Sequence, residues 1–199
     1  EKWVPETISD TTDSQMLVIP DAELRETHQV LTGNELVEDD FPASWPMFGS
    51  EFRMKIGGRV KLDMLYDFNG SNDRYQFLIS GIPVEGSPEY ANRGYFNMFV
   101  RESRFNVDMR RVTPGKVPLK IFIEADFWSS TSSFPFRLRH AYIVAGNWIF
   151  GQTWTTWSIM ESIPNLIDFA AGDALYGGRA AQVKYQNRVN DNWKWAVGL

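Results

Sequence analysis

The chain has 199 residues, of which 43% are hydrophobic and 15% aromatic, so its composition is not that of a disordered tail. Its formal net charge of −5 makes nonspecific binding to nucleic acid a poor candidate function. The absence of cysteine excludes a disulfide framework, a thiolate metal site and a cysteine nucleophile, and two histidines exclude a multi-histidine metal site.

The first 50 residues differ from the rest of the chain. They contain one predicted helix near residues 21–31, for which Asp21 is a suitable N-cap and Gly33 a suitable stop. The N-terminal stretch "EKWVPETISDTTDSQ" is polar and lacks the apolar region of a signal peptide. No apolar run in the chain approaches the roughly 18–20 residues that a membrane-spanning helix needs.

A strong strand signal begins at "RMKIGGRVKLDMLYDF", residues 53–68. Apolar side chains recur at every second position, with Leu65 as the main exception: Met54, Ile56, Val60, Leu62, Met64, Tyr66 and Phe68. Charged side chains occupy the other positions: Arg53, Lys55, Arg59, Lys61, Asp63 and Asp67. A period of two places each set on one face of a strand, so this segment is predicted to be one strand with an apolar and a charged face.

Similar alternation recurs along the chain. It predicts strands in "SRFNVDM", "LKIFIEADFW", "FRLRHAYIV", "AQVKYQ" and "NWKWAVGL", and a short apolar strand in "NWIFGQTWT" whose faces the pattern does not assign. In "FRLRHAYIV" the alternation sets Leu138, Tyr142 and Val144 against Arg137 and Arg139. The prediction is therefore about seven strands.

The connections between these strands alternate in length. Residues 69–94 and 156–178 form long loops, "SSTSSFP" a medium one, and "TPGKVP", "AGN" and "NRVNDN" short turns. Up-and-down membrane barrels sort their connections in this way, with short periplasmic turns and long external loops.

A soluble antiparallel sandwich also alternates apolar and polar residues, and the alternation alone favours it as the commoner case. Three features favour lipid as the partner of the apolar faces: the length of those faces, the sorted loops, and aromatic residues near strand ends. These aromatic residues are Phe52, Tyr66, Phe68, Tyr95, Phe127, Trp193 and Trp195.

Four stretches carry a family resemblance. "FGSEFRMKIGGRVKLDMLYDF", "RESRFNVDMR", "FRLRHAYI" and "GQTWTTW" resemble, in that order, the DcaP-like outer-membrane porins, and the resemblance spans residues 45–199. It implies a homotrimeric antiparallel β-barrel of about sixteen strands in the bacterial outer membrane, with a water-filled channel for small anionic solutes such as dicarboxylates. The strands predicted here fall short of that number, so we expect the chain to be the N-terminal part of a longer barrel.

The resemblance suggests two regions. Residues 1–50 are interpreted as a periplasmic or leader segment, for which a tail, a plug in the lumen and a disordered leader all remain open. Residues 51–199 are interpreted as the N-terminal part of the barrel, and its long loop at residues 156–178 would fold into the lumen as the third external loop of general porins does. Glu161, Asp168 and Asp173 would then face the solute, whereas the simpler alternative is an ordinary surface loop.

Basic residues on the charged faces are predicted to line the pore. They are Arg53, Lys55, Arg59, Lys61, Arg104, Arg137, Arg139 and Lys184. Rings of Arg and Lys favour anions in pores, and the planar guanidinium fork of Arg suits a carboxylate. The alternative is that these charges only solvate the wall and pair with Glu102, Glu124 and Asp126.

The sequence thus predicts a porin with lipid, small anionic solutes and two further copies of itself as partners, and with no cofactor, metal or nucleic acid. The main alternative is a soluble β-sandwich that acts as a binding or adhesion module. An enzyme is not expected, because catalysis would need a nucleophile–histidine pair near one rim, and only His28 and His140 are present.

Overall fold

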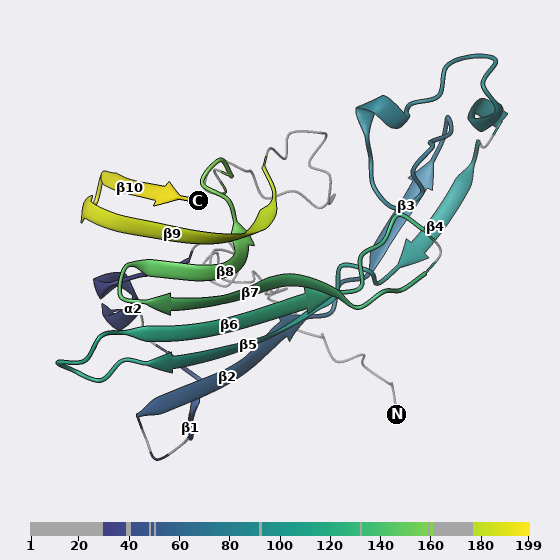
Figure 1. Ribbon diagram of the computed structural model, residues 1–199. Coiled ribbons are helices and arrows are strands. Elements are labelled where there is room, and N and C mark those ends of the chain that lie inside the picture. The colour runs from purple at the N-terminus through teal and green to yellow at the C-terminus, as the bar shows by residue number, and fades with distance from the viewer. Residues whose placement is uncertain are drawn as a thin grey trace, which may run out of the picture. The chain divides into compact units, whose positions relative to one another are not determined.

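The computed structural model describes residues 30–38, 41–47, 49, 51–91, 93–131, 133–158, 160 and 177–199. Its main feature is an eight-stranded sheet in the order β1-β2-β5-β6-β7-β8-β9-β10, in which every neighbouring pair is antiparallel (Figure 1). The strands are β1 (Trp45–Met47), β2 (Phe52–Arg59), β5 (Arg104–Arg111), β6 (Leu119–Asp126), β7 (Arg137–Ala145), β8 (Trp148–Trp154), β9 (Arg179–Asn190) and β10 (Trp193–Gly198). The antiparallel all-β fold expected from the sequence is confirmed.

A second, two-stranded sheet extends the β2–β5 pair. It consists of β3 (Asp63–Asp67) and β4 (Tyr95–Phe99), and the connection between them carries two short 3₁₀ helices, η1 (Ile79–Gly81) and η2 (Pro88–Ala91). The prediction of one continuous strand over residues 53–68 is therefore wrong, since β2 ends at Arg59. The alternation also gave no signal for β1 or β4.

The break between β2 and β3 is held by Lys61. Its ammonium lies 2.8 Å from the carboxylate of Asp63 and 2.6 Å from that of Glu102, and its backbone N–H donates to Ser103 Oγ at 3.1 Å. These contacts turn the side chain and the backbone of Lys61 toward the segment that joins β4 to β5. Strand pairing therefore stops locally and resumes beyond the break.

The two faces of the main sheet differ in chemistry and in exposure. One face, here called the apolar face, carries Ile123, Phe150 and Val183, which are 45%, 43% and 42% exposed. On the opposite face, the polar face, the side chains of Lys120 and Glu124 are 3% and 1% exposed. A soluble sheet buries its apolar face and exposes its polar one, whereas the wall of an outer-membrane barrel does the reverse. The observed exposure has the second pattern.

Aromatic side chains gather at both ends of the apolar face. Near the turns that join β7 to β8 and β9 to β10, the ring of Trp148 lies 5.0 Å from Tyr185, which lies 5.3 Å from Trp195. Near the opposite end of the strands, Phe136 lies 6.1 Å from Phe105 and 5.9 Å from Phe127. Two aromatic belts separated by aliphatic residues are typical of the two interfaces of a membrane-spanning wall.

One strand departs from strict alternation. Glu124 of β6 pairs with His140 of β7, but Ala125 pairs with Leu138, so Arg139 is an extra residue in a β-bulge. The bulge places both Arg139 and His140 in buried positions, with 3% and 2% exposure. The predicted grouping of Leu138 with Tyr142 and Val144 is wrong, because the extra residue reverses the faces: Leu138 is exposed while Tyr142 and Val144 are buried.

The connections lie at two ends of the main sheet. Residues 112–118, 146–147 and 191–192 join strands at the short-turn end, and residues 60–103, 127–136 and 155–178 join them at the long-loop end. At the short-turn end, a hydrogen bond and the charge of Lys116 lower the pKa of the exposed Glu51 carboxyl below its ordinary value. The sorted connections agree with the lengths predicted from the sequence.

The described N-terminal part contains one short helix, α2 (Asn34–Glu38). Residues 21–29 of the predicted helix lie outside the described residues, and residues 30 and 31 are not helical. Gly33, expected to end that helix, instead precedes α2 and has a φ of 54°. No helix in the described part of the chain is long and apolar enough to cross a membrane.

Candidate functional site

Charged residues of the polar face gather at the long-loop end of the sheet. Arg59 is the last residue of β2, Arg104 the first of β5 and Arg137 the first of β7, and Asp126 is the last of β6. Cross-strand pairing joins them in sequence, because Arg59 pairs with Arg104, Arg104 with Asp126, and Asp126 with Arg137. We call the following set the arginine cluster: Arg59, Arg104, Glu124, Asp126, Arg137, Arg139 and Arg179.

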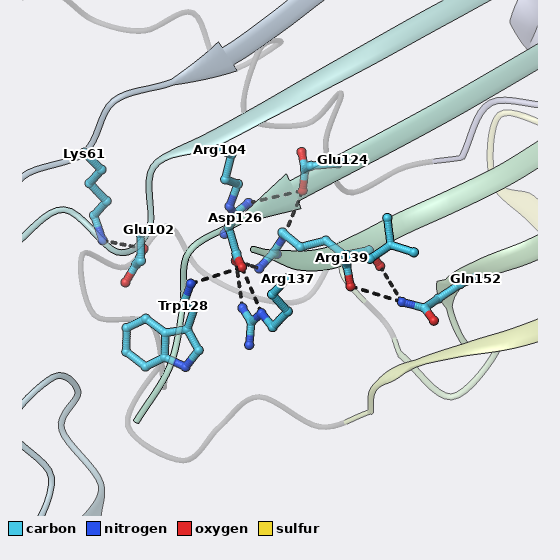
Figure 2. Close-up of polar contacts among 10 residues, drawn as sticks. Lys61, Glu102, Arg104, Glu124, Asp126, Trp128, Arg137, Arg139 and Gln152 are labelled. Atoms are coloured by element: carbon cyan, nitrogen blue, oxygen red, sulfur yellow. Dashed lines mark hydrogen bonds and ion pairs between the residues drawn. The ribbon is translucent and has the colours of Figure 1, made fainter. Parts of the chain in front are cut away.

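Asp126 lies at the centre of the arginine cluster and is fully buried (Figure 2). Its carboxylate accepts two hydrogen bonds from Arg137, from Nε at 2.8 Å and from Nη2 at 2.7 Å. It accepts a third from Arg139 Nη1 at 2.7 Å and a fourth from the backbone N–H of Trp128 at 3.2 Å. This two-pronged guanidinium–carboxylate geometry is the strongest type of protein ion pair.

Arg139 links the two carboxylates of the cluster. Its Nε donates to Glu124 Oε1 at 2.8 Å while its Nη1 donates to Asp126 (Figure 2). The bulge positions this side chain, and Gln152 Nε2 braces the same backbone by donating to the carbonyl groups of Leu138 and Arg139 at 3.2 and 3.3 Å. Arg139 is thereby fixed on both its side chain and its main chain.

Two further arginines approach the same carboxylates. Arg104 Nη1 lies 3.9 Å from Glu124 Oε1, and Arg104 is within electrostatic range of Arg59 and Arg139. Arg179 covers the ring of Trp154 at 4.5 Å and is within electrostatic range of Arg137 and Arg139.

The arginine cluster carries an excess of positive charge. Five guanidinium groups face two carboxylates, which leaves a formal excess of three positive charges within it. Arg59 Nε, Arg104 Nε and Arg179 Nη1 are buried and donate no hydrogen bond to any described residue. Arg137, with a 32% exposed side chain, is the cluster's most accessible arginine among those in ion pairs. The arrangement favours an anion near this end of the sheet.

Comparison with known proteins identifies the kind of sheet that carries this cluster. The sequence profile of the family described as DcaP outer membrane protein matches residues 27–199. The chain belongs to the DcaP outer membrane protein family. This membership places it in the outer membrane, and it agrees with the exposed apolar face and the two aromatic belts.

A solved structure supports the same fold. The crystal structure of the outer membrane channel DcaP of Acinetobacter baumannii superposes with a TM-score of 0.63 at 22% sequence identity. The match covers 78% of this chain and 43% of that channel, so this DcaP family member spans less than half of its length. No curated protein sequence gives a significant match.

The structure distributes the eight predicted basic residues of this DcaP family member over three places. Four belong to the arginine cluster: Arg59, Arg104, Arg137 and Arg139. Arg53, Lys55 and Lys184 lie elsewhere on the polar face, where Lys184 Nζ donates to the carbonyl of Trp154 at 3.2 Å. Lys61 lies outside the strands and holds the break between β2 and β3. The predicted pairing with Glu102, Glu124 and Asp126 is observed for Lys61, Arg104, Arg137 and Arg139.

The three acidic residues assigned to the constriction loop, Glu161, Asp168 and Asp173, lie outside the described residues. In the described part of this DcaP family member, no group of three or more His, Cys, Asp or Glu side chains could hold a metal ion. His140, one of the two histidines, is buried, and its Nδ1 lies 3.0 Å from Thr153 Oγ1.

Sequence reasoning missed two charged features. Arg179 was not predicted, because the strand predicted from the sequence begins only at Ala181, whereas β9 begins at Arg179. The second feature is a buried trio nearer the short-turn end, in which the carboxylate of Asp108 lies 2.8 Å from Arg110 and 3.1 Å from Lys120. Each member of the trio occupies a charged position of its strand pattern, but the alternation does not show which charges meet.

Proposed function

We propose that the complete protein forms a passive diffusion channel for small anionic solutes, such as dicarboxylates. The observation that supports this function is the arginine cluster, with its formal excess of three positive charges on the polar face. Basic residues that line a pore lower the electrostatic cost for an anion and raise it for a cation. Two of the cluster's guanidinium groups, those of Arg137 and Arg139, bind the carboxylate of Asp126, and we propose that a solute carboxylate is bound by the same type of contact.

The alternative is that these charges only solvate the wall and neutralise one another. Asp126 and Glu124 do neutralise part of the cluster, since Arg137 and Arg139 are paired with them. Arg59 and Arg179, however, have no ion pair with a described carboxylate within 4.0 Å, so the pairing is incomplete among the described residues. An incomplete neutralisation favours a role in anion selectivity.

We further propose that the protein acts as a homotrimer and without catalysis. The trimer rests on the family resemblance, and a closed barrel would need strands beyond β1 and β10, which stand at the edges of the main sheet.

The buried setting of His140 among Phe122, Tyr142 and Trp154 gives it no described nucleophile to activate beyond Thr153.

Reversal potentials in a salt gradient across planar bilayers test the anion preference. The full-length protein should pass chloride better than potassium, and succinate should interrupt the chloride current. The double variant Arg59→Gln/Arg104→Gln removes two charges, each of which alters anion entry about twofold at a distance of roughly 10 Å in water. Each lost charge raises cation entry by the same factor, so the chloride-to-potassium permeability ratio should fall about sixteenfold.

The double variant Arg74→Gln/Arg93→Gln is the matched control. It removes the same charge from two exposed arginines that cover Tyr95 and Tyr90 in the β3–β4 extension. Its selectivity should equal that of the wild type. A folded protein that prefers cations, or a cluster variant with unchanged selectivity, would contradict the proposed function.

A further inference from the structure

Two described stretches before the sheet, residues 31–38 and 41–44, contact the polar face at the short-turn end. Within them, Thr32 contacts β9, Phe41 contacts β5 and Ser44 contacts β2, so their contacts extend across almost the whole width of the sheet. All three contacted residues lie near the short-turn ends of their strands. We call the described residues 31–38 and 41–44 the rim strap.

One end of the rim strap is attached to β9 and to the β7–β8 turn. Gln186 Nε2 donates to Thr32 Oγ1 at 3.0 Å, and both residues are only 4% exposed. The backbone N–H of Gly33 donates to the carbonyl of Gly146 at 2.8 Å. Leu36 of α2 is fully buried, so this end is fixed by packing as well as by hydrogen bonds.

The other end of the rim strap is attached to basic residues of β5 and β2. The guanidinium of Arg110 lies 4.2 Å from the centre of the Phe41 ring. Arg53 donates to Ser44 twice, from Nε to the hydroxyl at 2.7 Å and from Nη2 to the carbonyl at 2.6 Å. The rim strap therefore accepts hydrogen bonds from Arg53 and covers the guanidinium group of Arg110. Without the strap, both groups would face the space beside the polar face.

The rim strap also brings a negative charge to this end of the sheet. The Glu35 carboxylate lies 3.5 Å from Arg188 of β9 and 3.8 Å from Lys194 of β10. Its side chain is 14% exposed, whereas that of Arg188 is 49% exposed. The carboxylate of Glu35 thus partly neutralises the positive charges of Arg188 and Lys194 at the short-turn end.

We infer that the rim strap is a second selectivity element, which narrows the short-turn mouth of the channel and lowers its positive potential through Glu35. This inference rests on the proposed channel function and concerns the opposite end of the sheet from the arginine cluster. The cluster favours anions at the long-loop end. The strap limits both the width and the anion preference at the other mouth.

Planar-bilayer recordings on the full-length protein test the charge. Glu35→Gln should raise the chloride-to-potassium permeability ratio about sixfold, because one unit charge at roughly 8 Å in water changes the entry of each ion about 2.4-fold, in opposite directions. Asp191→Asn is the matched control, because Asp191 lies 3.8 Å from the same Arg188 but on the β9–β10 turn, fully exposed and outside the strap. A shift with Glu35→Gln that is no larger than the shift with Asp191→Asn would overturn the role of Glu35.

Two truncations of the full-length protein test the width. Removal of residues 1–44 deletes the strap and should increase the single-channel conductance above that of a protein without residues 1–29, which keeps it. If the longer truncation fails to fold, a shift with Glu35→Gln no larger than that with Asp191→Asn still overturns the inference. A conducting protein in which neither comparison shows a difference overturns the strap alone, while a folded wild type without current overturns the channel function as well.

Discussion

Asp126 is the residue on which the arginine cluster depends most. It is fully buried and accepts side-chain hydrogen bonds from two arginines, so the loss of its charge weakens the ion pairs of Arg137 and of the buried Arg139 at once. Asp126→Asn should lower the free energy of unfolding by about 3–5 kcal/mol, as is typical when one partner of a buried ion pair is removed. Urea-induced unfolding of the full-length protein in detergent or lipid vesicles measures this change.

A surface ion pair provides the contrast for that measurement. Glu51 pairs with Lys116 at the short-turn end, where both side chains are largely exposed, at 43% and 47%. Glu51→Gln should leave the unfolding midpoint almost unchanged, because solvent screens exposed pairs. Equal effects of the two substitutions would show that the burial of Asp126 does not strengthen its interactions.

Gly57 and Gly58 form a matched pair for a backbone prediction. At Gly58 a Cβ would overlap the carbonyl oxygen of Arg104 and lie 2.8 Å from the Cα of Phe105, and its φ of 146° disfavours other residues. At Gly57 a Cβ would meet the end of the Asn106 side chain at 2.8 Å, which can move aside. Gly58→Ala should therefore reduce the yield of folded, heat-modifiable protein sharply, whereas Gly57→Ala should preserve it.

At the scale of the elements, the exposure of apolar side chains on β6 predicts that this face contacts lipid. Ile123 lies near the middle of that strand and is 45% exposed. Ile123→Lys should destabilise the folded protein by about 2–4 kcal/mol, the cost of a lysine near the bilayer midplane. Asn106→Lys adds the same charge on the polar face opposite Glu124 and should be tolerated. Equal destabilisation in vesicles by both would contradict the assignment of the faces.

The alternation in the sequence predicted the faces of β5, β6 and β9 correctly. Phe105, Ile123 and Val183 fall on the exposed side, and their charged or polar neighbours fall on the other. Alternation works there because strand geometry alone determines the direction of each side chain. Four of the cluster's five arginines were found in this way, since each occupies a charged position of its strand.

Alternation failed where contacts between strands alter the local geometry. The bulge at Arg139 depends on how β6 and β7 pair, and the break at Lys61 depends on Glu102, which is distant in sequence. β4 was missed because "YFNMF" has a single polar residue and follows a long loop. Arg179 joins the cluster only through tertiary structure. Period-two reasoning contains none of these non-local contacts.

At the scale of the whole molecule, the main sheet ends in two unpaired edges. β1 and β10 each have one neighbour in the described part of the chain, and every residue of β10 is exposed. Unpaired backbone groups are costly in lipid, so an open sheet cannot span a bilayer by itself. Closure should come from further strands of the complete protein.

Expression of two forms tests this expectation. The full-length protein should fold in detergent to a heat-modifiable species, whereas residues 1–199 alone should aggregate or remain sensitive to protease. Both forms contain the same arginine cluster and the same rim strap. A difference in folding would therefore show that the additional strands close the barrel. A heat-modifiable species formed by residues 1–199 alone would show that two free edges are compatible with a stable membrane fold.

The single extra residue at Arg139 also constrains how this family varies in length. Deleting one residue between Arg137 and His140 would restore perfect alternation but remove the side chain that joins Glu124 to Asp126. Without that deletion, the spacing between Arg137 and Tyr142 must stay constant, or Tyr142 and Val144 would turn toward lipid. When relatives of different length are aligned, gaps should therefore fall in the long loops and not in β7. A relative with a gap in β7 should have different charged contacts at the long-loop end of the sheet.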